Sequence, residues 1–536
     1  MQEGIQTPAG TPRLGAPLSE GPPVTSGTEG SGPGAGPKAP PGGGDPLADL
    51  ELLLKARYGL VVLETEEEDR AGSLLRHLAD ALDLPLFTWT RTKGLRRDGL
   101  ESAVYGSTDP SRALAHVEAS GFPAIYHFRG LASYLDDDVV AQRLADAARS
   151  YADLAGALVL TGGKLALPDS VTALAARLRL PAPGVAEYAD LLDRLVRDLR
   201  ERGRVQVELG DRDRRRLLER LHGLTLLEAE KVLTRVMVED GRLGADDLDE
   251  VLEAKRDLVE RDGLLEYRPS GAGLDEVADL AALRAWLEER KAFFHDPARA
   301  RSFGLPAPRG ILLLGVPGCG KSLSARAVAG SWTLPLLKLD PSRLYNKFVG
   351  ETERNFRRAT DMAERLAPVV LWIDEIEKAF SAAGEGDGGV SMRVLGSFLA
   401  WLQDRQGDVF VVATANDVSR LPPELLRKGR FDEIFFVDLP DREARRAVLT
   451  LHLARRDRDP KAFDLDALAE ATDGFSGSEL EQAIVAGLYA SFSEGSALTT
   501  ARILEEVRRT RPLSRVMAEK VEGLRSWARG RTVPAN

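Results

Sequence analysis

The chain has 536 residues, of which 43% are hydrophobic and 29% charged, which is typical of globular proteins and long enough for about two to four domains. The net charge of −11 argues against a general nucleic-acid binder, which would carry a basic face. A single cysteine excludes an internal disulfide framework, and no apolar run approaches the roughly 20 residues of a membrane-spanning helix. We therefore expect a cytoplasmic protein without a signal peptide.

Residues 1–45 are dominated by small and turn-forming residues, with 12 glycines and 9 prolines. Such a segment buries too little apolar surface to offset its ordering entropy, so we expect a disordered tail. From Pro46 onward, strand-like and helix-like patterns alternate.

Residues 46–184 are predicted to form an α/β domain. Residues 185–261 are largely helical and rich in Leu, Arg, Glu and Asp, and 262–271 (DGLLEYRPSG) is typical of a linker. Short apolar runs between helical patterns indicate the buried strands of the first domain, at 59–64, 122–128 and 157–162.

A second α/β region is predicted at 272–441. Strands that alternate with helices imply a parallel sheet wrapped by helices, with ligands at the carboxyl ends of the strands. We expect a helical lid at 442–515 and a C-terminal tail at 516–536. The strand candidates of the sheet are 310–315, 335–340, 368–374, 408–415 and 433–440.

The segment GVPGCGKS at 315–322 fits the phosphate-loop pattern GxxxxGK[ST], between a buried strand and a helical run. Its glycines let backbone N–H groups curl around phosphates, and the helix N-terminus adds a positive dipole. Lys321 is expected to reach the β and γ phosphates of ATP, and Ser322 to ligate Mg²⁺. The expected nucleotide-binding residues of this segment and its surroundings are Gly315, Val316, Pro317, Gly318, Cys319, Gly320, Lys321, Ser322, Leu323 and Asp374.

Polar residues end the strands that follow. Asp374 is expected to complete the Mg²⁺ shell and Glu375 to activate the attacking water. Asn416, in VVATAND, is placed to sense the γ-phosphate. Arg427 and Arg430, in LRKGRFDEIFF, precede the next strand and are expected to reach a neighbouring subunit's γ-phosphate, which makes the active site a shared one.

Together these motifs resemble the AAA family of ATPases. GFSGSELEQAI at 474–484 is similar to that family's lid motif, which implies that Gly477 and Ser478 lie near the nucleotide base. YNKFVGETERNFRRA at 345–359 resembles its first pore loop, which implies a hexameric ring with the pore-loop residues facing a central channel. These residues are Lys347, Phe348 and Val349, and a second pore loop is expected at 383–393.

A narrower resemblance runs from about residue 48 to 515, to the AAA proteins encoded by an uncharacterised reading frame of algal plastids and cyanobacteria. It is carried by ELLLKARYGLVVLETEEEDR, LPLFTWTRTKGL, LWIDEIEKAF and LRKGRFDEIFFVDLP. This resemblance implies no particular substrate. The Gly/Pro-rich tail and the aromatic pore loop depart from it.

The two α/β regions also resemble each other. GLVVLETEEEDRAGSLLRHL at 59–78 aligns with GILLLGVPGCGKSLSARAVA at 310–329, and the alignment places Phe128 and Arg129 opposite the Asp and Glu of the second region. We predict a tandem, a degenerate AAA-like module and then an active one, with the same strand order in both. A dissimilar α/β fold is the alternative.

Acidic residues stand in the first module where phosphates would bind. Thr65 and Glu68 fit a capping box, in which the acids complement the dipole of the helix that they begin. They also make nucleotide binding to this module unfavourable. The acids are Glu64, Glu66, Glu67, Glu68 and Asp69.

We therefore predict an ATPase that remodels or unfolds a protein partner within a homo-oligomeric ring. The alternative is an ATP-gated regulatory or scaffolding protein that threads nothing. The six histidines do not form the HExxH zinc site of an AAA metalloprotease. The acidic balance argues against a helicase or a clamp loader, so no nucleic-acid partner is expected.

Overall fold

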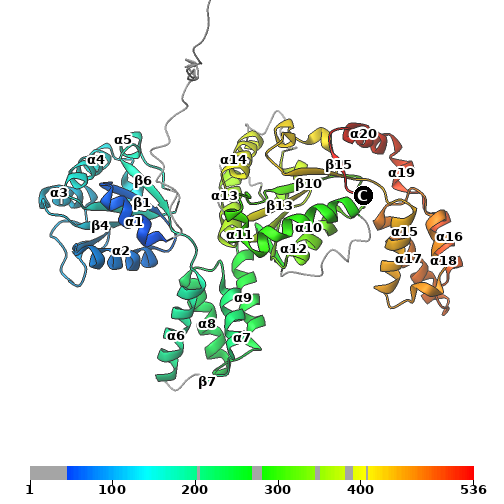
Figure 1. The fold of residues 1–536 in the computed structure, drawn as a ribbon, viewed down its shortest axis with the longest axis horizontal. Coiled ribbons are helices and arrows are strands. Elements are labelled where there is room, and N and C mark those ends of the chain that lie inside the picture. The colour runs from blue at the N-terminus through cyan, green and yellow to red at the C-terminus, as the bar shows by residue number, and fades with distance from the viewer. Residues whose placement is uncertain are drawn as a thin grey trace, which may run out of the picture. The chain divides into compact units, whose positions relative to one another are not determined.

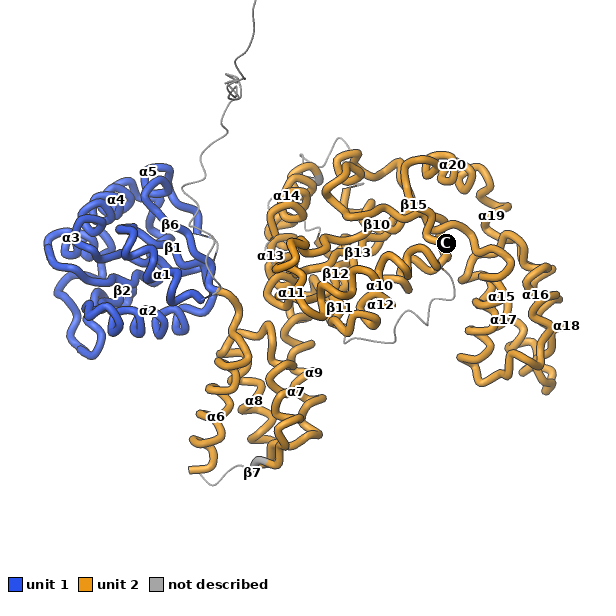
Figure 2. The backbone as a smooth tube through the Cα atoms, in the orientation of Figure 1, with its two compact units in different colours: residues 1–180 blue, residues 181–536 orange. Residues whose placement is uncertain are grey.

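The chain divides into two compact units, residues 1–180 and residues 181–536 (Figure 2). The first unit is an α/β domain with one sheet, and the second contains a larger sheet and two groups of helices (Figure 1). The computed structural model describes residues 45–163, 165–201, 206–268, 280–344, 351–380, 390–405 and 408–536.

The first unit is a six-stranded sheet in the order β3-β2-β4-β5-β1-β6, antiparallel only between β2 and β3. Side chains of β1 alternate between its faces: Val61 and Leu63 pack with α1 and α2, and Leu60 and Val62 pack with α3 and α4. Its elements are α1 (Pro46–Lys55), β1 (Leu60–Glu64), α2 (Glu68–Leu82), β2 (Leu86–Thr90), β3 (Gly94–Arg97), α3 (Pro110–Ser120), β4 (Ile125–Arg129), α4 (Asp138–Asp153), β5 (Ala157–Gly162), α5 (Asp169–Thr172) and β6 (Ala175–Arg179).

The second unit begins with a helical bundle around a leucine-rich core. A capping box starts its helix α8, where Thr225 and Glu228 exchange side-chain and backbone hydrogen bonds. Part of the predicted linker that follows is ordered as β9 (Leu265–Arg268), which pairs antiparallel with β11 of the large sheet. The elements of the bundle are α6 (Val185–Glu201), β7 (Gln206–Val207), α7 (Asp211–Leu221), α8 (Leu226–Asp240), β8 (Arg242–Leu243) and α9 (Asp247–Glu260).

The large sheet has the order β15-β14-β10-β13-β12-β11-β9. Helices α10 and α12 cover one face, where Ile311 and Leu313 of β10 point, and α13 and α14 cover the other, with Leu312 and Leu314. Its elements are α10 (Ala281–His295), α11 (Pro297–Ser302), β10 (Gly310–Gly315), α12 (Lys321–Trp332), β11 (Leu336–Leu339), α13 (Glu351–Arg365), β12 (Val369–Ile373), α14 (Val390–Asp404), β13 (Val409–Ala415) and β14 (Glu433–Val437).

A second group of helices follows the sheet. The segment 516–536, predicted as a tail, is folded: it forms a helix and a short strand that pairs with β14 at the sheet edge. The elements are α15 (Arg442–Ala454), α16 (Leu465–Ala471), α17 (Gly477–Ser493), α18 (Thr500–Arg509), α19 (Leu513–Val516), α20 (Ala518–Ala528) and β15 (Val533–Pro534).

Five consecutive strands have the same spatial order in the two sheets. The series β6-β1-β5-β4-β2 matches β14-β10-β13-β12-β11, and every neighbouring pair in both is parallel. The prediction of a tandem of two modules with the same strand order is confirmed, and the alternative of a dissimilar α/β fold is wrong.

Strand register corrects the sequence alignment by one residue. The LPL sequences at 84–86 and 334–336 lead into the equivalent strands β2 and β11, so Leu86 is equivalent to Leu336. Leu86 pairs with Ile125 of β4 and Leu336 pairs with Val370 of β12, so Ile125 is equivalent to Val370. Arg129 thereby falls at the position of Asp374, where the sequence alignment had placed Phe128.

The backbone supports the corrected register. Gly130 is then equivalent to Glu375, and both have left-handed backbones, with φ of +73° and +51° respectively. A glycine adopts this conformation without a steric penalty, whereas a glutamate at such a position is strained.

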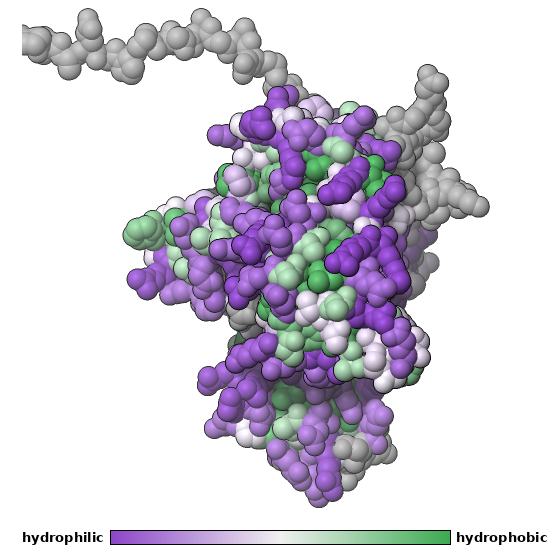
Figure 3. Space-filling view, turned by 90° about the vertical axis from the view of Figure 1, so that its right-hand side faces the viewer, coloured by the Kyte–Doolittle hydropathy of each residue, from purple (hydrophilic) through white to green (hydrophobic). Residues whose placement is uncertain are grey.

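Hydrophilic residues dominate the face of the molecule shown in Figure 3, with hydrophobic ones scattered among them. Among the helices that the structure describes, none combines the length and the apolar character needed to cross a membrane.

Candidate active site

The phosphate-loop motif forms the turn between β10 and α12. Gly315, Gly318 and Gly320 have φ of +147°, +81° and +89°, which glycine adopts readily. A Cβ on Gly315 would lie 1.9 Å from the carbonyl oxygen of Val437 on β14, so the close approach of these strands requires glycine. Helix α12 begins at Lys321, and its N-terminus faces the loop.

Lys321 is buried and folded back onto its own loop. Its Nζ donates to the carbonyl oxygens of Gly315 at 2.9 Å and Val316 at 2.8 Å. Burial lowers the pKa of its ammonium group to about 8. The ammonium therefore has to leave these carbonyls before it can reach a phosphate.

The other motif residues fill the loop. Val316 is buried, Pro317 and Cys319 are half-buried, and Leu323 packs against the core beneath α12. Burial raises the pKa of the Cys319 thiol to about 12, so the thiol stays protonated and behaves as a small filler.

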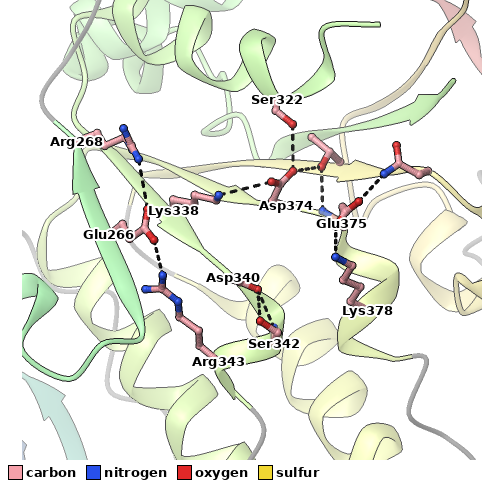
Figure 4. Close-up of polar contacts among 12 residues, drawn as sticks. Glu266, Arg268, Ser322, Lys338, Asp340, Ser342, Arg343, Asp374, Glu375 and Lys378 are labelled. Carbon is pink, nitrogen blue, oxygen red and sulfur yellow. Dashed lines mark hydrogen bonds and ion pairs between the residues drawn. The ribbon is translucent and has the colours of Figure 1, made fainter. Parts of the chain in front are cut away.

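Oxygen atoms that could ligate a metal ion lie close together at the start of α12 and the end of β12 (Figure 4). The hydroxyl of Ser322 lies 3.2 Å from Oδ1 of Asp374, and the hydroxyl of Thr414 donates to the same oxygen at 2.9 Å. Lys338 Nζ lies 3.6 Å from Oδ2 of Asp374. One hydroxyl and one carboxylate beside a phosphate loop fit Mg²⁺, which keeps several waters and takes its other ligands from phosphates.

Glu375 follows Asp374 and is held from three sides. Its backbone N–H donates to the hydroxyl of Thr414 at 3.0 Å, and Nδ2 of Asn416 donates to its Oε1 at 2.8 Å. Lys378 forms an ion pair with its other carboxylate oxygen (Figure 4). The carboxylate and the amide predicted from separate strands therefore lie in direct contact.

A third acid, Glu377, contacts the backbone of Asn416. Its Oε1 accepts a hydrogen bond from the backbone N–H of Asn416 at 2.9 Å, and its Oε2 has no hydrogen-bond partner among the described residues. Burial raises its pKa. Glu377 thus fixes the backbone of the residue that contacts Glu375.

The two arginines lie at the opposite edge of the sheet from the phosphate loop, because they precede β14 and β14 runs parallel to β10. Arg427 is exposed, and its side chain forms no hydrogen bond or ion pair with the described part of the chain. Arg430 donates to the carbonyl of Leu399 at 2.8 Å and to Gln403 at 2.9 Å, both on α14. Neither arginine is placed to serve its own chain's phosphate loop.

The lid touches the phosphate loop through the start of α17. The backbone N–H of Ser478 donates to the carbonyl of Gly318 at 3.0 Å, and its hydroxyl lies 3.3 Å from the same oxygen. A Cβ on Gly477 would also lie 3.3 Å from this oxygen. The predicted pore-loop residues Lys347, Phe348 and Val349 lie outside the described residues.

Sequence reasoning missed four residues of this cluster. Lys338 is the one charged residue of its apolar strand, and Glu377 and Lys378 complete the run DEIEK. Each interrupts an apolar pattern close to a recognised motif, and this signal could have marked them. Thr414 gave no such signal, since threonine is common in strands.

The first module lacks the phosphate loop itself. Residues 65–67 join β1 to α2, whereas the longer segment 316–320 joins β10 to α12. Glu68 and Asp69 already belong to α2, and Arg129 pairs with them at 3.0 and 2.9 Å. Carboxylates and an arginine therefore neutralise each other where phosphates and the acid Asp374 belong in the second module.

The predicted capping box of α2 is wrong. The hydroxyl of Thr65 accepts from the N–H of Glu67 at 2.9 Å, and Glu68 turns toward Arg129. The other acids are also partnered: Glu64 pairs with Arg177 at 2.8 Å, and Glu67 pairs with Arg70 at 3.2 Å. The acidic run is thus largely neutralised by arginines rather than left as open negative charge.

Three family models match successive parts of the chain. The N-terminal domain of SpoVK-like AAA ATPases matches residues 47–180, and their second domain matches 186–262. The model described as "ATPase family associated with various cellular activities (AAA)" matches 311–439.

Similar proteins match either most of the chain or part of it. The "uncharacterized AAA domain-containing protein ycf46" of Pyropia yezoensis is 33% identical over 90% of this chain and 97% of its own length. The protein of the same description in Guillardia theta is 33% identical over 90% of this chain and 94% of its own length. The proteasome-activating nucleotidase of Aeropyrum pernix is 37% identical over 38% of this chain and 51% of its own length.

Proposed function

The chain belongs to the family of AAA ATPases that includes the ycf46 proteins, and we propose that it uses ATP hydrolysis to remodel or unfold a protein partner in an oligomeric ring. The contact between Glu375 and Asn416 at the carboxyl edge of the sheet carries the hydrolytic part of this proposal, because it sets a carboxylate suited to act as base against a positioning amide beside a phosphate loop. The division into domains at 46–184, 185–261, 272–441 and 442–515 is part of the proposal, as is a cytoplasmic location.

In this proposal, Lys321 leaves its two carbonyls and contacts the β and γ phosphates of ATP. Ser322 and Asp374 would hold Mg²⁺, which would neutralise phosphate charge. Gly477 and Ser478 meet the nucleotide from the lid side. The nearby Lys338 balances the charge of Asp374 when no cation is bound.

Glu375 accepts a proton from the attacking water, whose oxygen bonds to the γ-phosphorus while the bond to the ADP oxygen breaks. Asn416 orients Glu375 and the γ-phosphate. Arg427 and Arg430 act on the site of a neighbouring subunit, which their place at the far edge of the sheet supports. Membership of the AAA family, whose members commonly assemble as hexamers, supports a ring of six subunits.

The second candidate is an ATP-gated scaffold that threads nothing. The first module favours it, because a domain with an ion-paired site and no phosphate loop is free to serve as a docking platform. The two candidates differ at Phe348, which only threading requires in the channel.

The test uses a trap variant. The Glu375→Gln chain with ATP should retain its protein partner in a pull-down, and the partner is then offered to the wild-type chain and to Phe348→Ala. Loss of remodelling in Phe348→Ala with ATP hydrolysis retained supports threading. Full remodelling by Phe348→Ala contradicts it and favours the scaffold.

A further inference from the structure

We propose that residues 513–536, here called the strap, couple the lid to the catalytic edge of the sheet, and that Lys520 and Arg525 are positioning residues for ATP hydrolysis. The strap comprises α19, α20 and β15 (Figure 1). This inference rests on the proposed function, because it assigns a control element to the same site.

The strap starts at the corner of the lid that touches the phosphate loop. Glu479, in the first turn of α17, accepts from the backbone N–H of Leu513 at 2.7 Å through one oxygen and from that of Ser476 at 2.8 Å through the other. The hydroxyl of Ser514 donates to the carbonyl of Gly474 at 2.6 Å. A shift of this corner relative to the phosphate loop therefore pulls on the strap.

Helix α20 then contacts the loop that carries Asn416. Lys520 Nζ lies 3.3 Å from the carboxylate of Asp417, the next residue in the chain. The side chain of Asn416 in turn contacts Glu375. Lys520 is thus two residues removed from the proposed base, through one ion pair and one hydrogen bond.

The same helix contacts the residue that follows β14, the strand beside the phosphate loop. Nε of Arg525 donates to both carboxylate oxygens of Asp438, at 2.8 and 3.0 Å. Asp438 follows Val437, whose carbonyl accepts from the N–H of Val316 at 3.1 Å. One helix therefore forms ion pairs with Asp417, which follows Asn416, and with Asp438, which follows the residue that bonds the phosphate loop.

The far end of the strap is fixed in the sheet. The N–H of Ala535 donates to the carbonyl of Phe436 at 3.0 Å, and its carbonyl accepts from the N–H of Leu283 at 3.1 Å. Ala535 is fully buried in the core. With one end in the sheet and the other on the lid, the strap transmits lid displacement to α20 rather than following it freely.

Stability alone does not account for the two ion pairs. The side chains of Lys520 and Arg525 are 43% and 38% exposed, and ion pairs as exposed as these contribute little to the stability of the fold. Their position beside catalytic loops is what distinguishes them. Their removal should therefore change turnover more than it changes unfolding.

The test compares full-length Lys520→Ala, Arg525→Ala and the double variant with Arg529→Ala, which removes an exposed arginine that caps the same helix. We expect the double variant to lose about fivefold or more in kcat for ATP hydrolysis, with KM within about twofold of wild type. The melting temperature should stay within about 2 °C of wild type, because the pairs are exposed. Lys520→Arg keeps the charge and should recover turnover relative to Lys520→Ala.

A kcat of the double variant equal to that of Arg529→Ala overturns the inference while the proposed function stands. A fall in melting temperature large enough to explain the lost activity overturns it too, because the pairs are then merely structural. Absence of ATP hydrolysis by the wild-type chain overturns the proposed function and the inference together.

Discussion

Arg129 at the end of β4 occupies the position that Asp374 occupies at the end of β12. In the second module this position places a carboxylate beside the hydroxyl of Ser322, and in the first it places a guanidinium against the carboxylates of Glu68 and Asp69. The charge pattern of the site is reversed and satisfied within the chain. The first module therefore keeps the fold of a nucleotide-binding domain without its chemistry.

We predict that the chain binds one nucleotide, in the second module. Lys321→Ala removes the proposed phosphate-binding ammonium and should abolish ATP binding in calorimetric titration. No weaker binding of ATP to the first module should then remain. Glu375→Gln is the control, because it keeps the phosphate loop intact and should still bind ATP. Residual saturable binding in Lys321→Ala would contradict the assignment of the first module as empty.

Restoring the acid to the first module should not restore nucleotide binding there. Arg129→Asp recreates the side chain of Asp374 but places it beside Glu68 and Asp69, with no phosphate loop nearby. We expect a loss of about 1–3 kcal/mol in the unfolding free energy of the first unit, from like-charge contact and lost ion pairs. Chemical denaturation with and without ATP checks both points, and stabilisation by ATP through this unit would contradict them.

The stability of the first unit should fall in mild acid because of His127. Burial lowers its pKa to about 4, from an ordinary value of 6.5, and its Nε2 lies 2.9 Å from the hydroxyl of Thr161. Between these values the unfolded chain binds more protons, so unfolding becomes easier as pH falls from about 6.5 to about 4, by up to about 3 kcal/mol.

His127→Gln keeps a nitrogen for Thr161 and cannot gain a charge. Urea unfolding at several pH values should show a flatter dependence for this variant than for the wild-type chain. Equal slopes for the two chains would exclude His127 as the source of the acid sensitivity.

The contact between lid and phosphate loop should set nucleotide affinity. A Cβ on Gly318 would lie 2.9 Å from the hydroxyl of Ser476, and its φ of +81° already favours glycine. Gly318→Ala should therefore push the lid corner away and raise the KM for ATP by about tenfold. Gly320→Ala is the control, since its φ of +89° carries the same strain but its Cβ meets open space. Equal KM values for the two variants would show that strain, not the lid, causes the loss.

Two inactive chains should complement each other if the site is shared. Arg427→Ala lacks the proposed donor and Glu375→Gln lacks the base, so each alone should hydrolyse ATP slowly. In a mixed ring, Glu375 of the first chain meets Arg427 of the second, and phosphate release should rise above the sum of the separate rates. Strictly additive rates in a mixture that has exchanged subunits would contradict a donor in trans.

Much of the fold followed from sequence periodicity. The strands that are buried nearly throughout, β1, β4, β5, β10, β12 and β13, stand out as apolar runs and were predicted. The more exposed strands β2, β3 and β6 of the first sheet were not among the predicted strands. The capping box at Thr65 was wrong because α2 begins only at Glu68, so Thr65 lies two residues before the N-cap. The register error at Arg129 was visible only from the pairing of β2 with β4 and of β11 with β12.

Those residues of the candidate site that belong to recognisable motifs were predicted, and those that reach it only through the folding of the chain were missed. Asp374, Glu375 and Asn416 end strands that parallel pairing brings together. Glu377 and Lys378 matter because a one-turn helix after β12 returns them to the same edge. The role of the strap was not predicted from the sequence. It depends on ion pairs to residues about 90 to 100 positions away, and local sequence patterns do not show such pairs.

Phosphate release by Glu375→Gln, measured beside its ATP binding, tests the central claim most directly. A chain that hydrolyses ATP with Glu375 as base should lose about 100-fold or more in turnover on this change, while it still binds ATP. Turnover near that of the wild-type chain would show that the cluster around Glu375 and Asn416 is not the active site.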